Sequence, residues 1–244
     1  MVIEGRRLIT QAAAHGIPLR LLGGVAIWLR AGDAARGLFG RSYPDLDFVV
    51  HKKQSRAFRS FLEESGYLPE RTFNAMHGAT RLLYHSPDGG FQVDVFLDIF
   101  KMCHVLDLGE RLEVEDLTVP VAELILTKLQ IAEINRKDVG DVLMLLYDHE
   151  PADVDGASRL NVARLQTLCG ADWGLFTTIT DNLAKARELI SEFVSDETVA
   201  NSLRQRIDEI QGRLEVAPKT AAWKMRARIG RRKRWYELPE HVTR

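Results

Sequence analysis

Two stretches decide the fold of this chain: LLGGVAI at residues 21–27 and RSYPDLDF at residues 41–48. The first is a short apolar run that stops at Gly23 and Gly24 and continues into helix-forming residues, which predicts a buried strand turning directly into a helix. The second leads into a Phe-Val-Val run, which predicts a strand over residues 45–51. We therefore expect a strand, a glycine turn, a helix and a second strand, in that order.

These two stretches bring together groups suited to a metal and a phosphate. Asp45 and Asp47 are two positions apart on a predicted strand, so both carboxylates lie on one face and repel each other unless a cation separates them. Oxygen ligands favour Mg²⁺ or Mn²⁺. Backbone amides at Gly23 and Gly24, at the start of a helix, suit a phosphate, because glycine allows close approach. Each pattern alone is common in ordinary turns and solvated strands, whereas their combination favours a nucleotide site.

The order of these motifs resembles that of the polymerase-β-like nucleotidyltransferases, whose signature is hydrophobic-Gly-Gly/Ser, a spacer and Asp-hydrophobic-Asp. Gly-Gly-x-Ala at 23–26 and Arg-Ser-x-x-Asp-Leu-Asp-Phe at 41–48 resemble the AbiEii-type abortive-infection toxins and their uncharacterised bacterial relatives. The spacer is longer here than usual, and an insertion in a Gly- and Arg-rich loop over 32–44 would account for it. The resemblance implies that Asp45 and Asp47 hold a catalytic metal and that the glycines and Ser42 contact the nucleotide.

The resemblance also implies a third carboxylate on a neighbouring strand. The stretch FQVDVFLD at 91–98 supplies two candidates, because strand alternation places Asp94 and Asp98 on the same face. Asp94 lies in the middle of a strong strand, where aspartate is unfavourable by propensity, while Asp98 is roughly 13 Å further along, near the rim. Asp94 is therefore the preferred third metal ligand and general base, and Asp98 the alternative.

Lys128 and Asp138, in the second half of the chain, resemble residues of the C-terminal motifs of the AbiEii-type enzymes. Lys128 lies in an apolar helical stripe with Leu124, Ile125, Ile131 and Ala132. Its side chain either extends to water or contacts a phosphate. The stretch Lys137-Asp138-x-x-Asp141 predicts a helix with Asp138 as N-cap and Asp141 closing a capping box. The resemblance implies instead that Lys128 and Asp138 belong to the nucleotide site.

The remaining pattern predicts an α+β chain: a small mixed β-sheet flanked by helices, followed by a helical C-terminal half. Pro120 marks the change of character, so the expected domains are residues 1–120 and 121–244. The expected elements are helices over 2–15, 25–31, 54–65, 121–136 and 139–148, further helices from 157 onward, and strands over 19–22, 81–85, 91–100 and, at an edge, 112–119.

Composition limits the class of protein. Among 244 residues, 45% are apolar and 27% charged, and the formal net charge is −1. Residues 223–236 carry seven Lys or Arg, several aromatic rings and no acid, which suits contact with RNA, although a solvated tail or docking on the acidic remainder also explains it. Two distant cysteines argue against a disulfide scaffold or structural zinc. Without a signal peptide or long apolar run, the sequence predicts a cytoplasmic protein with no membrane partner.

The leading hypothesis is an enzyme that transfers a nucleoside monophosphate from an NTP, such as ATP, to a hydroxyl. Two metal ions held by the three carboxylates would bind the triphosphate, and pyrophosphate would leave. The acceptor could be RNA such as tRNA, a protein side chain, or a small molecule of the antibiotic type. The AbiEii resemblance implies a toxin restrained by an antitoxin protein. The alternative is a nucleotide-binding or interaction module without catalysis.

Overall fold

The computed structural model describes residues 1–238, which belong to two compact units. The first unit comprises residues 1–30, 41–100 and 105–120, and the second comprises residues 31–40, 101–104 and 121 onward. The main division follows Pro120, where the sequence changes from strand-rich to helical. Each unit has its own buried apolar core.

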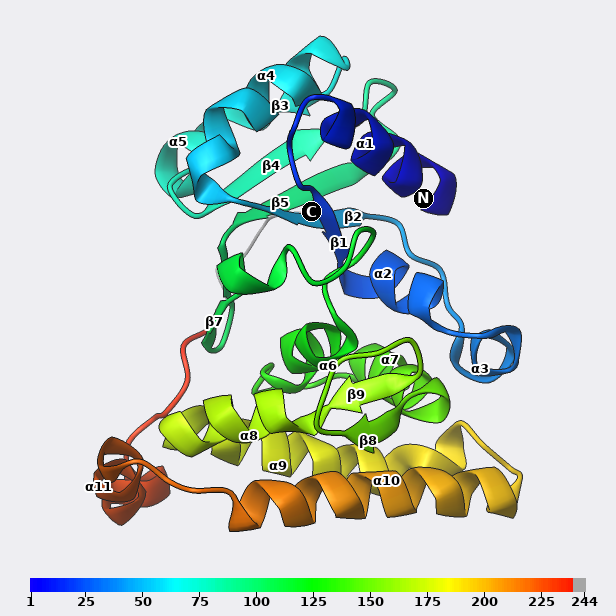
Figure 1. The fold of residues 1–244 in the computed structure, drawn as a ribbon, viewed down its shortest axis with the longest axis vertical. Helices are drawn as coiled ribbons and strands as arrows, with labels where there is room; N and C mark the ends of the chain where they lie inside the picture. The colour runs from blue at the N-terminus through cyan, green and yellow to red at the C-terminus, as the bar shows by residue number, and fades with distance from the viewer. Residues whose placement is uncertain (239–244) are drawn as a thin grey trace. The chain divides into compact units, whose positions relative to one another are not determined.

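A five-stranded mixed sheet lies at the centre of the first unit, with strand order β1-β2-β5-β4-β3 (Figure 1). The strands are β1 (Arg20–Leu22), β2 (Leu46–Val50), β3 (Leu68–Pro69), β4 (Arg81–His85) and β5 (Gln92–Leu97). β2 and β5 run parallel, and the other neighbours are antiparallel. The flanking helices are α1 (Val2–Ala14), α2 (Gly23–Arg30), α4 (Ser55–Glu64) and α5 (Arg71–His77), with 3-10 turns η1 (Lys52–Gln54) and η2 (Gly109–Arg111). The predicted mixed sheet flanked by helices is confirmed.

The two faces of the sheet differ in what they present. Leu46 and Phe48 of β2 are fully buried. Gly5 of α1 lies against Leu21 and Leu46, where an added Cβ would be 3.1 Å from a Leu21 methyl group. Helix α1 therefore covers the apolar face, and Figure 1 shows α4 on the same side. Because side chains alternate along a strand, Asp47 points to the opposite face.

The edge of the sheet beside β1 is shorter than predicted. Leu21 donates its backbone N–H to Leu117 O at 3.0 Å, and Val119 donates to Leu21 O at 3.1 Å. These bonds make one parallel bridge at Thr118 rather than the predicted strand over 112–119. The turn at η2 continues to Val114, whose N–H donates to Arg111 O, so residues 112–114 are not available for pairing.

The predicted strand over 91–100 is interrupted. β5 ends at Leu97, and Asp98 has φ of 58°, in the left-handed region that an L-residue rarely adopts. The chain then forms β6 (Ile99–Lys101), which pairs with β7 (Val105–Asp107) in a separate two-stranded sheet. The change of direction at Asp98 therefore ends the strand that carries Asp94.

The stretch 32–44, predicted as a loop, contains helix α3 (Asp33–Phe39). A helix of seven residues is marginal alone, so tertiary packing has to stabilise it. Phe39 is buried against the rings of Tyr147 and Phe193, with centroids 6.3 and 6.0 Å away. Gly32 donates its N–H to Asp148 Oδ2 at 2.6 Å. These contacts are distant in sequence, which explains why local pattern missed the helix.

The second unit is mainly helical, as the sequence predicts. Besides α3, its elements are α6 (Val121–Leu129), α7 (Arg136–Asp148), α8 (Val162–Ala171), α9 (Trp173–Leu189), α10 (Glu197–Val216) and α11 (Ala221–Ile229), with 3-10 turns η3 (Ile190–Glu192) and η4 (Gly230–Arg232). A small parallel pair, β8 (Glu150–Ala152) and β9 (Arg159–Asn161), interrupts the helices. Over residues 1–238, none of the helices has the length and apolar character needed to cross a bilayer.

Two boundaries in the second unit correct the predictions. Helix α6 ends at Leu129 instead of 136, because Asn182 Nδ2 donates to Leu129 O and Ile131 O, both at 2.7 Å, and so satisfies carbonyls at the helix end. The N-cap of α7 is Asn135 rather than Asp138. The Asn135 side chain accepts the N–H of Asp138 at 3.0 Å, which places Asp138 inside the first turn.

Candidate active site

Gly23 brings the start of α2 against a carboxylate of β2. Strand β1 ends at Leu22, which is paired with Asp47, and α2 begins at the next residue. Gly23 has φ of +63°, and a Cβ added there would be 1.9 Å from Asp47 Oδ2. Both the backbone conformation and the close approach therefore require glycine. Despite the long spacer, the glycine turn and the Asp-x-Asp motif meet.

The parallel pairing of β2 with β5 places two of the predicted carboxylates side by side. Asp47 is directly opposite Asp94 in the register, so their side chains lie on the same face of the sheet, on strands roughly 4.8 Å apart. Asp45 immediately precedes β2, two residues before Asp47, and all three residues are partly exposed. Asp98 lies beyond the last pair, Val50 with Leu97, and its carboxylate is 3.1 Å from His51 Nδ1. The register therefore favours Asp94 over Asp98.

Arg81 of β4 binds the Asp94 carboxylate; β4 lies beside β5 on the side opposite β2. Its Nε donates to Asp94 Oδ1 at 2.8 Å, and Nη2 donates to Asp94 Oδ2. The guanidinium also lies over the rings of Phe73 and Phe96, 5.5 and 5.1 Å from their centroids, and the Arg81 side chain is largely buried. A bidentate, stacked arginine fixes a carboxylate strongly. No sequence motif marks Arg81 as a partner of Asp94.

An aromatic ring and a second arginine cover Gly24. A Cβ on Gly24 would be 2.1 Å from Tyr43 Cδ1 and 3.2 Å from Arg41 Nη2. The Arg41 guanidinium lies 4.4 Å from the centre of the Tyr43 ring, whose other neighbour is Trp28 at 6.0 Å. Gly24 therefore accommodates a tyrosine, and Arg41 places a cation at the start of α2. Ser42 is exposed, and its carbonyl oxygen accepts from Arg41 Nη1 at 3.1 Å.

Lys128 and Asp138 meet in the second unit, together with Asp141. Lys128 Nζ lies 2.8 Å from Asp138 Oδ1 and 2.9 Å from Asp141 Oδ2, and Asp141 is completely buried. Burial lowers the pKa of Lys128, but the two carboxylates outweigh burial, so its pKa is raised above the ordinary lysine value. Of the two roles expected for Lys128, extension to water is not observed, because its ammonium is paired inside the unit. The cluster carries one cation and two carboxylates.

The basic segment 223–236 is partly docked on α9. Arg226 stacks on Trp173 with a separation of 4.7 Å, and Arg231 makes two bonds to the Asp181 carboxylate at 2.7 and 2.8 Å. Trp235 Nε1 donates to Thr178 Oγ1 at 3.0 Å. Five further cations are exposed and, among residues 1–238, pair with no acidic side chain: Lys224, Arg228, Arg232, Lys233 and Arg234, the last of which lies over the Tyr236 ring. Docking therefore uses part of the segment and leaves a basic surface.

The donor set at the sheet has the chemistry that a divalent cation requires. Asp45, Asp47 and Asp94 contribute only carboxylate oxygens, which suits Mg²⁺ or Mn²⁺. In the part of the chain that the structure describes, however, no three His, Cys, Asp or Glu side chains are grouped so as to hold a metal. Asp94 is engaged by Arg81 instead. A metal at this face has to share Asp94 with Arg81 or displace it.

Sequence pattern identified the carboxylates of Asp45, Asp47 and Asp94, here called the carboxylate row, and the glycine turn, but it missed Arg41, Tyr43 and Arg81. Arg41 and Tyr43 belong to the motif at 41–48, so their closeness in sequence to Asp45 could have marked them as site residues. Arg81 had a weaker signal, since it depends on the register of β4 against β5. Comparison with models of known protein families and with curated proteins finds no match to this chain.

Proposed function

We propose that this protein is a metal-dependent nucleotidyltransferase, which moves a nucleoside monophosphate from an NTP to a hydroxyl acceptor. The observation that carries the proposal is the contact of Gly23 with Asp47, together with the pairing of Asp47 and Asp94 across parallel strands. A helix start, a backbone without Cβ and adjacent carboxylates are the parts needed to hold a triphosphate beside a cation. The motif order at 21–48 supports the same assignment.

Each residue of the site has a defined role in this reaction. The amides at Gly23 and Gly24 and the Arg41 guanidinium bind phosphate oxygens. Asp45, Asp47 and Asp94 would hold a divalent cation, which would supply positive charge to the triphosphate and would favour ionisation of the attacking hydroxyl. The acceptor oxygen bonds to the α-phosphorus as the bond from that phosphorus to the bridging oxygen breaks, so pyrophosphate leaves. Asp94 takes the proton of the acceptor hydroxyl, and Arg81 orients the Asp94 carboxylate.

A nucleotide-binding module without catalysis is the second candidate. The Arg81–Asp94 ion pair favours it, because the carboxylate that should accept a proton already has a cation partner. The two functions differ in turnover. The assay contains the protein, α-³²P-labelled NTPs and Mg²⁺ or Mn²⁺. The RNA, protein and small-molecule fractions of a cell extract are added one at a time as acceptors. We expect label transfer to one fraction with release of pyrophosphate. NTP binding without transfer to any fraction would support the binding module instead.

RNA is the acceptor that the basic surface at 223–236 favours. Phosphates attract exposed Lys and Arg, and each contact releases counterions, so affinity falls with salt. Replacing Lys224, Arg228, Arg232 and Lys233 by glutamine should weaken RNA binding and reduce the steepness of its log–log salt dependence by roughly 2–3. NTP binding should be unchanged. Fluorescence anisotropy with labelled tRNA over a salt series measures both quantities.

The matched control removes four exposed cations from the first unit: Arg6, Lys52, Arg56 and Arg71, each replaced by glutamine. Net charge then changes equally in both variants, so a purely global electrostatic effect would weaken RNA binding alike. Equal loss in the two variants would remove the argument for RNA at 223–236. A small-molecule acceptor would show transfer that neither variant alters.

A further inference from the structure

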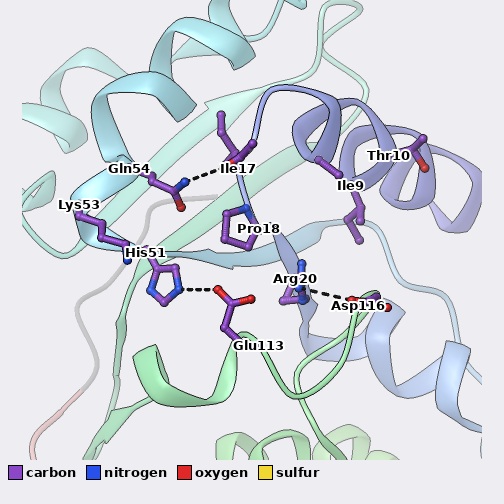
Figure 2. A pocket seen from close by; sticks show the side chains of 12 residues that line it. Ile9, Thr10, Ile17, Pro18, Arg20, His51, Lys53, Gln54, Glu113 and Asp116 are labelled. Atoms are coloured by element: carbon purple, nitrogen blue, oxygen red, sulfur yellow. Dashed lines mark hydrogen bonds and ion pairs between the residues drawn. The ribbon is translucent and has the colours of Figure 1, made fainter.

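A cleft of about 670 Å³ opens in the first unit between the second half of α1, the chain leading into β1, the turn η1 and residues 113–116 (Figure 2). Ile9, Ile17 and Pro18 form an apolar wall, and Arg20, His51 and Lys53 contribute polar groups. Its volume lies within the range of roughly 300–1,000 Å³ typical of small-molecule sites. His51 follows the end of β2, four residues beyond Asp47 and roughly 13 Å from it along the chain, and none of Asp45, Asp47 and Asp94 lines the cleft.

Arg20 gives the cleft a buried positive charge that is poorly neutralised. Its side chain is 8% exposed. Nε donates to the carbonyl of Glu115 and Nη1 donates to Leu19 O at 3.0 Å, which fixes the guanidinium. Its acidic partner is Asp116, which is 3.8 Å away and fully exposed. A buried cation without a close carboxylate is costly, so this position favours an anionic ligand.

The other charged groups of the cleft are His51, its two acidic neighbours and Lys53. His51 is 14% exposed and lies between the carboxylates of Asp98 and Glu113, at 3.1 and 3.2 Å. Glu113 is mostly exposed, so it can move into water when another anion approaches His51. Lys53 is exposed and, within residues 1–238, has no acidic partner. Figure 2 shows Lys53, His51 and Arg20 along one side of the cleft.

We propose that this cleft binds a phosphomonoester of a small molecule with an apolar or ring-shaped body. A phosphomonoester carries a charge near −2 at neutral pH and three acceptor oxygens, which matches two cations, Arg20 and Lys53, better than a single carboxylate does. The wall of Ile9, Ile17 and Pro18 packs on the body of the ligand. Glu113 and Asp116 turn away as the phosphate arrives. The site does not depend on the proposed nucleotide transfer.

Calorimetric titration with phenyl phosphate, in EDTA, tests the proposal, with phenol and benzoate as probes that lack the phosphate. The wild-type protein should bind phenyl phosphate and should bind phenol and benzoate at least about tenfold more weakly, because phenol is neutral and benzoate offers one charge and two acceptor oxygens in place of nearly two charges and three oxygens. Lys53→Met should weaken phenyl phosphate binding several-fold. Lys52→Met is the control, because Lys52 is exposed and adjacent but does not line the cleft.

Two further variants separate the cleft from the carboxylate row. Arg20→Lys should weaken phenyl phosphate binding more than Lys53→Met, whereas Asp47→Asn should leave it unchanged. If Arg20→Lys does not fold, the comparison of Lys53→Met with Lys52→Met still shows whether the cleft binds phenyl phosphate. The proposal is overturned if the wild type binds none of the probes at millimolar concentration, if Lys53→Met and Lys52→Met bind alike, or if Asp47→Asn removes the binding.

Discussion

Replacing Asp47 by asparagine is expected to reduce nucleotide transfer at least about 10²- to 10³-fold, the loss typical of removing one electrostatic group from an active site. Asp47 is the carboxylate that contacts Gly23 and is paired with Asp94, so it lies between the proposed phosphate and metal positions. The asparagine has nearly the same shape and keeps the close fit to Gly23. Initial rates with labelled NTP at saturating acceptor measure the effect.

Stability distinguishes a catalytic role of Asp47 from a structural one. Removing one of two adjacent carboxylates relieves repulsion, so the melting temperature of Asp47→Asn should be unchanged or slightly higher. Asp33→Asn, a substitution at an exposed position on α3, should preserve both activity and melting temperature. A large drop in the melting temperature of Asp47→Asn alone would show that Asp47 stabilises the fold, and its lost activity would then say nothing about catalysis.

The carboxylate row could be anticipated because it depends on local rules. Side chains two apart on a strand share a face, which grouped Asp45 with Asp47. The family resemblance implied a third carboxylate on a neighbouring strand, and Asp94 was preferred because aspartate is unfavourable in the middle of an apolar strand. The direct pairing of Asp47 with Asp94 required that β2 and β5 run parallel, whereas the family resemblance implied only that the two strands are neighbours. The left-handed conformation at Asp98 was not foreseen, since no glycine or asparagine marks that position.

The contacts that surround the row depend on tertiary structure and could not be anticipated. Arg81 reaches Asp94 only because β4 pairs with β5 with Arg81 opposite Phe96, and a hairpin loop of several residues leaves that register open. Likewise Asp138 and Asn135 are both good N-cap residues, and local pattern chose the wrong one. Helix α3 exists because Phe39 packs on distant rings.

Replacing Lys128 by methionine is expected to destabilise the protein by about 3–5 kcal/mol, the cost typical of removing one partner from a buried ion pair. The substitution keeps the length of the side chain but leaves the carboxylates of Asp138 and Asp141 without their cation, one of them completely buried. The raised pKa of Lys128 means that its stabilising effect is complete below the ordinary lysine pKa of about 10.4 and is lost as pH rises through the higher folded-state value. The loss in Lys128→Met should therefore be equal at pH 7 and pH 9, as measured by urea unfolding.

A double variant shows whether Lys128 stabilises the fold or binds the nucleotide. Lys128→Met combined with Asp141→Leu removes the buried carboxylate along with its partner and should recover a large part of the stability, because a buried ion pair replaced by apolar groups is often close to neutral. If Lys128 only stabilises α6 against α7, this double variant also recovers NTP binding. If Lys128 contacts a phosphate, as its motif implies, the double variant folds but binds NTP weakly, since the cation is still missing. A single variant that melts at the wild-type temperature would contradict the paired geometry itself, because the two carboxylates could not then be buried beside a methionine without cost.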